Sequence, residues 1–252
     1  MNIICIIPAR YQSRRLPGKP LAIIGEHPMI EWVYHRASQT KMISRVIVAT
    51  DDRRIYDTVK AFGGEVVMTP AELASGSDRA AYVAREYASD IIINLQGDEP
   101  LITSAVLESV CAAFHSDHVM MATPVKRISE YRELTDPNLV RVVLDKEQYA
   151  LYFTRSVVPY LRDYSDQTTW ISYFPYFKHI GLYAYQRNFL LQLSQWPAGD
   201  LEKAERLEQL RVLENGYKIK TVETDYQALS VDTPDDLIYI NNYIQEKKIT
   251  MD

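Results

Sequence analysis

The sequence predicts an α/β protein with a Rossmann-like, mostly parallel sheet and helices on both of its faces. Short apolar runs typical of buried strands alternate with segments of helical periodicity through the first 130 residues. From about residue 131 the strands become aromatic and closely spaced, which indicates antiparallel pairing. The 252 residues therefore predict one α/β domain over 1–130 and 186–252, with a smaller inserted mixed or antiparallel region over 131–185.

The elements of the first part follow in a regular order. Buried strands are expected at 2–7, 45–50, 65–69, 90–95 and 119–124. Helices are expected at 29–37, at 52–62 and on the face formed by Leu107, Val110, Cys111 and Phe114. Thr50 or Asp51 is the expected cap of helix 52–62, and Ser77 that of the helix after "SGSDR" (75–79).

The second part begins with the insertion and returns to the main domain. We expect strands at 139–144, 150–154 and 179–185, then helix 201–216, strand 218–223 and a helix from Thr233 to about 246. The buried stripe predicted for helix 201–216 consists of Leu201, Ala204, Leu207 and Leu210.

Composition excludes several classes of protein. The chain has no long uncharged apolar run and no signal peptide, so we expect a cytoplasmic protein without membrane insertion. Its net charge of −5 argues against general nucleic-acid binding. Cys5 and Cys111 lie in apolar patterns and are interpreted as packing residues. The P-loop pattern and the G-x-G-x-x-G fingerprint are both absent, which removes support for a nicotinamide or flavin dehydrogenase.

The loop after the first strand is the most informative segment. "PARYQSRRLPGKP" (8–20) gathers Arg10, Arg14, Arg15 and Lys19 beside Gly18 in a globally acidic chain. Open α/β sheets bind ligands beyond the carboxyl ends of their strands, and arginine forks match phosphate oxygens. Glycine lets the backbone approach a ligand closely. The loop therefore predicts a polyphosphate site, and the alternative is a solvated basic loop.

Two acidic segments are candidates for a metal site. "NLQGDEP" ends an apolar strand, so Asp98 lies where a carboxylate could hold Mg²⁺ together with substrate oxygens. The alternative is a simple turn at the end of the strand. In "VDTPDDL", Thr233 and Pro234 are expected to start a helix, with Asp235 and Asp236 in its first turn. This interpretation leaves Asp232 unexplained.

The loop is similar to the N-terminal signature of the sugar-acid cytidylyltransferases, and most similar to the CMP-Kdo synthetases (3-deoxy-manno-octulosonate cytidylyltransferases) among them. Further blocks occur in the family's order and cover nearly the whole chain. They are "VATDD" (48–52), "SGSDR" (75–79), "NLQGDEPLI" (94–102), "ALYFTRS" (150–156), "KHIGLYAY" (178–185), "LEQLRVLENG" (207–216) and "VDTPDDL" (231–237). Three positions depart from the family's pattern, namely Arg14, Ser77 and Thr154; we expect Arg14 to face solvent.

The resemblance implies a role for each candidate residue. CTP would be bound by Pro8, Ala9, Arg10, Arg15, Lys19, Ser75 and Arg79. Asp98 and Asp232 would hold Mg²⁺, the implied cofactor, and together with Arg10 and Lys19 would form the catalytic set. The sugar acid would be bound by Gln96, Arg155, His179, Tyr183, Glu208 and Gln209.

The implied reaction transfers CMP from CTP to the 2-hydroxyl of 3-deoxy-D-manno-octulosonate (Kdo) and releases pyrophosphate. Its product serves lipopolysaccharide biosynthesis, and the implied assembly is a homodimer formed through the inserted region. Alternatives are the same chemistry on an 8-amino Kdo or another 2-keto sugar acid, or a capsule-directed Kdo enzyme. A non-catalytic nucleotide-binding module is a further alternative, although a pure binder does not need both carboxylates.

Overall fold

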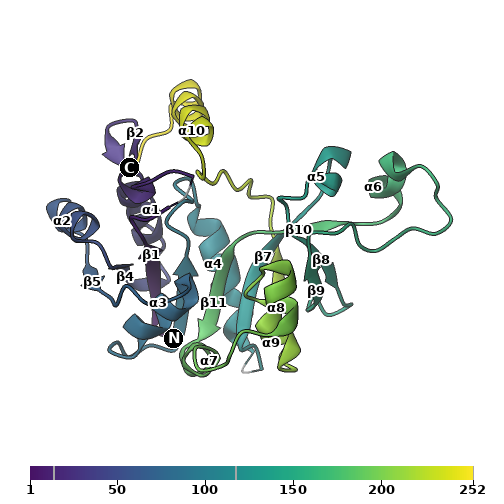
Figure 1. Cartoon of the computed structure of the whole chain (residues 1–252), viewed down its shortest axis with the longest axis horizontal. Helices are drawn as coiled ribbons and strands as arrows, with labels where there is room; N and C mark the ends of the chain where they lie inside the picture. The colour runs from purple at the N-terminus through teal and green to yellow at the C-terminus, as the bar shows by residue number, and fades with distance from the viewer. Residues whose placement is uncertain (14, 117, 252) are drawn as a thin grey trace.

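A large sheet organises the molecule (Figure 1). The computed structural model describes residues 1–13, 15–116 and 118–251. In the described chain the sheet has ten strands, in the order β5-β4-β1-β6-β11-β7-β10-β8-β9, with β12 beside β7. The strands of the first part are β1 (Ile3–Ala9), β4 (Ile43–Thr50), β5 (Val66–Met68), β6 (Ile91–Leu95) and β7 (Met121–Arg127). Those of the second part are β8 (Arg141–Leu144), β9 (Ala150–Thr154), β10 (Phe177–His179), β11 (Leu182–Gln186) and β12 (Lys220–Glu223).

Strand directions confirm the predicted fold class. β5, β4, β1 and β6 are parallel neighbours, and β12 is parallel to β7. β11 runs antiparallel between β6 and β7, with Tyr183 opposite Asn94 of β6. The carboxyl ends of β1 and β6 therefore lie at one edge of the sheet, where the two candidate loops follow them. A separate small hairpin joins β2 (Ile23–Ile24) to β3 (His27–Pro28).

Helices cover both faces of this sheet because consecutive side chains of each buried strand point to opposite sides. Ile3, Cys5 and Ile7 of β1 pack in one core cluster with α1, α2 and α4, whereas Ile4 and Ile6 pack in another with α3, α7 and α9. The first group comprises α1 (Met29–Ser38), α2 (Arg53–Ala61) and α4 (Ser104–Ala112), which continues into the 3₁₀ turn η2 (Ala113–His115). The second comprises α3 (Gly76–Ala84), α7 (Arg187–Leu193) and α9 (Leu210–Glu214).

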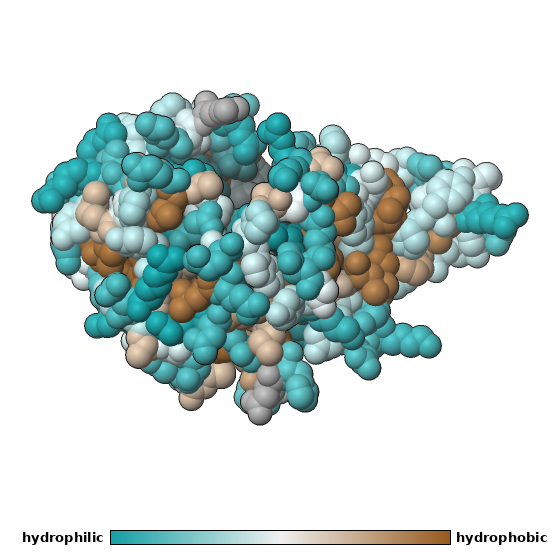
Figure 2. All heavy atoms as spheres, turned by 60° about the horizontal axis from the view of Figure 1, so that its bottom comes forward, coloured by the Kyte–Doolittle hydropathy of each residue, from teal (hydrophilic) through white to brown (hydrophobic). Residues whose placement is uncertain are grey.

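The inserted region extends the sheet and carries an arm. β8, β9 and β10 continue the sheet antiparallel, with β9 at its edge. Residues 155–176, here called the arm, carry η3 (Gln167–Thr169) and α6 (Trp170–Tyr173), and α5 (Tyr131–Thr135) precedes β8. The arm projects at the right of Figure 1, and Figure 2 shows hydrophobic side chains gathered where this extension joins the body.

The strand topology differs from the prediction for residues 179–185. The predicted strand 179–185 is two strands, because β10 ends at His179 and β11 begins at Leu182. Both pair with β7, but only β11 continues onto β6 in the main sheet. β11 thus lies between β6 and β7 in the middle of the ten-stranded sheet.

The predicted helix 201–216 is also wrong as a single element. It is α8 (Asp200–Glu205) and α9 (Leu210–Glu214), because Arg206 adopts a left-handed conformation with φ of 56° and ends α8. Leu207 and Leu210 are buried as expected, whereas Leu201 and Ala204 are exposed. The break directs the segment between the helices toward the sheet.

Local hydrogen bonds correct two predicted helix caps and confirm one. Asp52, rather than Thr50 or Asp51, caps α2 by accepting from the Arg54 N–H. Ser75, rather than Ser77, caps α3 in a capping box. Thr233 caps α10 (Pro234–Lys247), with Pro234 in the first turn, as predicted.

α10 packs over the β2–β3 hairpin and α1 through Ile24, Trp32, Ile240 and Ile244. Cys5 and Cys111 are free and buried, which agrees with their interpretation as packing residues. Within the described chain, the helices are all too short or too polar to cross a bilayer.

Candidate active site

The basic loop and the end of β6 enclose a cleft of about 460 Å³. On one side it is lined by Pro8, Ala9, Arg10, Arg15 and Lys19, and on the other by Gln96, Gly97 and Asp98. The arrangement follows from parallel pairing of β1 with β6, which brings the carboxyl ends of both strands to the same edge. The structure therefore brings together five of the predicted CTP-binding residues. Arg14 lies outside the described residues.

Gly18 gives the loop its shape. Its φ is +70°, and its N–H donates to the Tyr11 carbonyl at 2.9 Å. A side chain at this position would meet the Tyr11 ring at 3.1 Å. Glycine adopts this left-handed conformation without steric cost, so the loop folds back over the end of β1. Lys19, which follows directly, then points across the cleft toward the carboxylates.

Asp98 and Asp232 converge on one cation. The Lys19 ammonium lies 2.5 Å from Asp98 Oδ2 and 3.0 Å from Asp232 Oδ1. An Arg15 guanidinium nitrogen lies 3.0 Å from the same oxygen of Asp232. Burial alone lowers the pKa of Lys19, but attraction and hydrogen bonds from both carboxylates raise it overall. Lys19 is therefore a charged ammonium at neutral pH.

A backbone hydrogen bond holds the two carboxylates side by side although they are far apart in the sequence. The Val231 N–H donates to the Asp98 carbonyl at 3.0 Å. Asp232 is fixed from its other side, because its N–H donates to Asp236 Oδ2, which also completes the capping box of α10. The interpretation of Thr233 and Asp236 as helix-start residues is therefore confirmed. Asp232 in addition contacts Arg15 and Lys19, which line the cleft.

The donor set fits a small divalent cation completed by substrate. The two carboxylates already approach a single positive charge, and a group of three or more His, Cys, Asp or Glu side chains suited to a metal is absent from the described residues. Mg²⁺ takes one or two protein carboxylates and fills its other positions with phosphate oxygens and water. Asp98 and Asp232 are thus the side chains that could hold such an ion beside a bound triphosphate.

Ser75 and Arg79, the other predicted nucleotide contacts, occupy different environments. Ser75 caps α3 and its hydroxyl donates to Glu208 Oε1 at 3.3 Å. Arg79 is completely buried, and its guanidinium pairs with Asp51 at 2.9 Å and donates to the Thr69 hydroxyl. The structure places Ser75 beside Glu208, one of the predicted sugar residues. It places the Arg79 side chain against Asp51 and Thr69, where it is not exposed to solvent.

His179 at the end of β10 and Tyr183 in β11 bring two polar side chains close together. Thr123 Oγ1 donates to the Leu182 carbonyl at 2.7 Å, so His179 Nε2, at 2.9 Å, must donate to this hydroxyl. His179 Nδ1 is then an acceptor. Burial lowers the pKa of His179 to about 3, so the imidazole is neutral. Its ring lies 5.2 Å from that of Tyr183.

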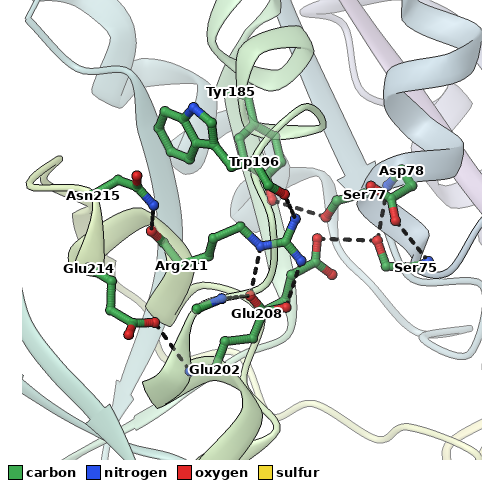
Figure 3. Close-up of polar contacts among 11 residues, drawn as sticks. Ser75, Ser77, Asp78, Tyr185, Trp196, Glu202, Glu208, Arg211, Glu214 and Asn215 are labelled. Atoms are coloured by element: carbon green, nitrogen blue, oxygen red, sulfur yellow. Dashed lines mark hydrogen bonds and ion pairs between the residues drawn. The ribbon is translucent and has the colours of Figure 1, made fainter.

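Glu208 and Gln209 lie in the segment between α8 and α9. Tyr183 donates to Gln209 Oε1 at 3.0 Å, and Gln209 Nε2 is buried without a partner among the described residues. Burial raises the pKa of Glu208, while a side-chain hydrogen bond with Ser77 and the charge of Arg211 act in the opposite direction. The structure therefore joins Tyr183, Gln209, Glu208 and Ser75 in one group (Figure 3 shows Glu208 and Ser75).

Arg155 stands apart from this group. It follows β9 and is exposed, and its guanidinium donates to the carbonyls of Pro137 and Asn138 at 3.3 and 3.2 Å. Its N–H donates to Glu205 of α8. The structure thus places Arg155 at the junction of the arm and α8, and a ligand would have to draw its side chain from these carbonyls.

Sequence patterns did not predict the contacts of several buried polar residues in the core of the protein. Glu99 accepts from the Tyr226 hydroxyl at 3.0 Å, and burial, followed by the charge of Asp98, raises its pKa to about 8. Ser77 accepts from Asn94 at 3.2 Å and lies 3.4 Å from the Tyr185 hydroxyl. The "QGDEP" motif gave a signal for Glu99. The sequence marks Ser77 only as an expected helix cap and a departure from the family's pattern. Its contacts with Asn94 and Tyr185 gave no signal, because the three residues are far apart in the sequence.

Comparisons with known proteins identify the family. The family model described as "Cytidylyltransferase" matches residues 4–219. A protein of Solibacter usitatus named 3-deoxy-manno-octulosonate cytidylyltransferase is 50% identical over 237 residues, which cover 94% of this chain and 92% of the relative. A protein of the same name from Fusobacterium nucleatum is 47% identical, with 99% of both chains covered.

A solved structure shares both the fold and the sequence. It is described as CMP:2-keto-3-deoxy-manno-octonic acid synthetase complexed with CTP, and it superposes with a TM-score of 0.92 at 41% identity. The superposition covers 98% of this chain and all of the other. From the extent of the family match and the identity to full-length relatives, we conclude that the chain belongs to the cytidylyltransferase family.

Proposed function

We propose that this protein transfers CMP from CTP to the 2-hydroxyl of Kdo, giving CMP-Kdo and pyrophosphate. The observation that carries the proposal is the convergence of Lys19, Asp98 and Asp232 in the basic cleft. The substrates are supported by the names of the relatives and by the CTP complex of the similar structure. The reaction joins two anions, so neutralising their charge is the main task of the site.

The chain's own residues perform this task from both sides of the cleft. Arg10, Arg15 and Lys19 would bind the triphosphate and neutralise the charge that grows on the leaving pyrophosphate. Asp98 and Asp232 would hold Mg²⁺, which when bound screens the phosphate oxygens and activates the attacking hydroxyl. Occupation of that site by the metal requires the Lys19 ammonium to leave the two carboxylates, which makes it available to the phosphates.

The sugar acid would lie between the cleft and the polar group around Tyr183. His179 Nδ1 and Glu208 supply acceptors for sugar hydroxyls, and Gln209 Nε2 supplies a donor. Gln96 lies at the boundary of the two sites, because it lines the cleft. Arg155 would pair with the sugar carboxylate after leaving the carbonyls it now contacts.

We further propose that the protein is a homodimer formed through β9 and the arm. β9 is an edge strand whose Leu151 is 59% exposed, and the arm exposes Tyr160 at 70% and Tyr173 at 58%. An open edge and large exposed apolar side chains are characteristic of surfaces that pair with another chain.

The decisive experiment measures pyrophosphate release from CTP and Mg²⁺ with Kdo, 8-amino Kdo, sialic acid or no sugar. Release that depends on Kdo supports the proposal, and preference for 8-amino Kdo transfers the same chemistry to that sugar. If folded protein binds CTP but releases no pyrophosphate with any sugar, the enzymatic proposal is wrong. Asp98→Asn is the matched variant and should abolish release while the fold is retained.

A further inference from the structure

The break between α8 and α9 places Glu208 and Gln209 where the proposed sugar site needs them. In an uninterrupted helix 201–216 the same residues would follow the helical periodicity along its surface. Instead, the left-handed Arg206 ends α8, and the turn over 206–209 directs Glu208 toward Ser75 and Gln209 toward Tyr183. Such a turn needs something to fix the two helices relative to each other.

Arg211 and Glu202 supply that constraint. Arg211 Nε and Nη2 donate to Glu202 Oε2 and Oε1 at 2.7 and 2.6 Å, a two-pronged pair that joins α9 to α8 across the turn. Nη1 donates to the Trp196 carbonyl at 3.2 Å, so the guanidinium is held from a third side. Both side chains are largely buried, at 9% and 13% exposure. Fork-to-carboxylate pairing fixes direction as well as distance.

The same guanidinium lies beside Glu208. Figure 3 shows it between the Glu202 carboxylate on one side and the Glu208 carboxylate, which faces Ser75, on the other. Asp78, Glu202, Tyr183 and Tyr185 are the other ionisable groups around Glu208. Arg211 is the positively charged residue among these neighbours, and its charge opposes the rise that burial causes in the pKa of Glu208.

We propose that Arg211 and Glu202 are positioning residues for the sugar acid: their ion pair holds the 206–209 turn so that Glu208 and Gln209 meet the sugar. The inference rests on the proposed function, because it assigns Glu208 and Gln209 to Kdo. Neither Arg211 nor Glu202 lines the nucleotide cleft. Loss of the pair should therefore weaken Kdo binding selectively and leave CTP binding intact.

The test uses Arg211→Lys, which keeps the charge but loses the fork, and Glu202→Gln, which keeps the shape but loses the charge. We expect each to raise KM for Kdo about tenfold, as for the loss of a charge-assisted contact, with the Kd for CTP changed less than about twofold. The control is Arg187→Gln, which removes an arginine that donates to the carbonyls of Ala84, Arg85 and Tyr87 at the other end of β11. It should lower Tm without changing KM for Kdo.

Hydrogen–deuterium exchange of the peptide covering 206–210 provides a readout that does not depend on activity. Exchange in this peptide should be about tenfold faster in Arg211→Lys and in Glu202→Gln, because the loss of local contacts makes local opening more frequent. It should be unchanged in Arg187→Gln. Unchanged exchange, unchanged KM for Kdo, or equal weakening of Kdo and CTP in a folded variant each overturns the inference. If the wild type fails to use Kdo, the proposed function fails, and the exchange result alone decides the positioning role.

Discussion

At the scale of single residues, Lys19 is the centre of the proposed catalytic group. Its side chain is 16% exposed, and its ammonium lies between Asp98 and Asp232, the two proposed metal ligands. Two anions hold a cation between them strongly when water is largely excluded. The Lys19 ammonium therefore neutralises both carboxylates until a divalent metal ion displaces it.

Replacing Lys19 by methionine should therefore have opposite effects on metal binding and on turnover. Without nucleotide, Lys19→Met should bind Mn²⁺ more tightly than the wild type, because no ammonium competes for Asp98 and Asp232. With both substrates, kcat should fall by about 10²–10³, as for other lost donors to developing charge. Electron paramagnetic resonance measures free Mn²⁺, and Lys60→Met on the exposed surface of α2 is the control. Equal Mn²⁺ affinity in Lys19→Met and wild type would contradict this account.

His179 makes the stability of the fold depend on pH. Its pKa is about 3 in the folded protein because it is buried, against an ordinary value of 6.5. Below pH 6.5 the unfolded chain binds a proton that the folded chain does not, so stability falls as pH decreases toward 3. The contribution should be about 2 kcal/mol between pH 7 and pH 5.

Urea unfolding at the two pH values tests this expectation. Between pH 7 and pH 5 the free energy of unfolding of His179→Gln should fall by about 2 kcal/mol less than that of the wild type. His115→Gln, which changes an exposed histidine, is the control. A slope in His179→Gln that equals the wild-type slope would show that folding leaves the pKa of His179 unchanged, which contradicts this account.

At the scale of elements, the turn between α8 and α9 departs most from the helical pattern in the sequence. Leu207 and Leu210 satisfy helical periodicity, yet the chain leaves the helix at Arg206. Periodicity therefore predicted the burial of Leu207 and Leu210 but not the exposure of Leu201 and Ala204. It carries no information on the backbone angle of one residue, and an arginine seldom adopts a left-handed conformation.

The conformation of Arg206 predicts a substitution effect. A β-branched residue tolerates φ near 56° poorly, so Arg206→Val should lower the free energy of unfolding by about 1–2 kcal/mol. Asn adopts this conformation readily, and Arg206→Asn should stay close to the wild type. Chemical denaturation measures both. Equal losses for Val and Asn would mean that the arginine side chain, and not its backbone, stabilises the turn.

Other elements were predictable because their signals are local. The parallel strands β1, β4, β5 and β6 follow from apolar runs, and the start of α10 follows from "DTPDD". The caps at Asp52 and Ser75 were displaced by one or two residues, since several adjacent hydroxyl and carboxyl groups compete for each helix start. The cleft followed from motifs at strand ends, whereas the Ser77–Asn94–Tyr185 contacts depend on strand order, which the sequence does not display.

At the scale of the whole molecule, we expect the arm and β9 to determine the oligomeric state. Light scattering after gel filtration should give twice the mass of one chain for the wild type. Tyr160→Asp together with Tyr173→Asp should give one chain, because two charges would be buried without partners. Tyr239→Asp, at a side chain of α10 that is 56% exposed, should remain dimeric. A monomeric wild type, or a dimeric double variant, contradicts the proposed interface.

The hydrogen bond from Val231 to Asp98 joins segments that are far apart in the chain, and this affects how the enzyme folds during its synthesis on the ribosome. The sheet can begin to form from its N-terminal strands. The basic loop is synthesised directly after β1 and before the other strands. Asp232 follows β12 in the chain, so it is synthesised after every strand of the sheet. A nascent chain therefore carries the basic loop and Asp98 long before it carries the second proposed metal ligand, and the proposed metal site can be completed only near the end of synthesis.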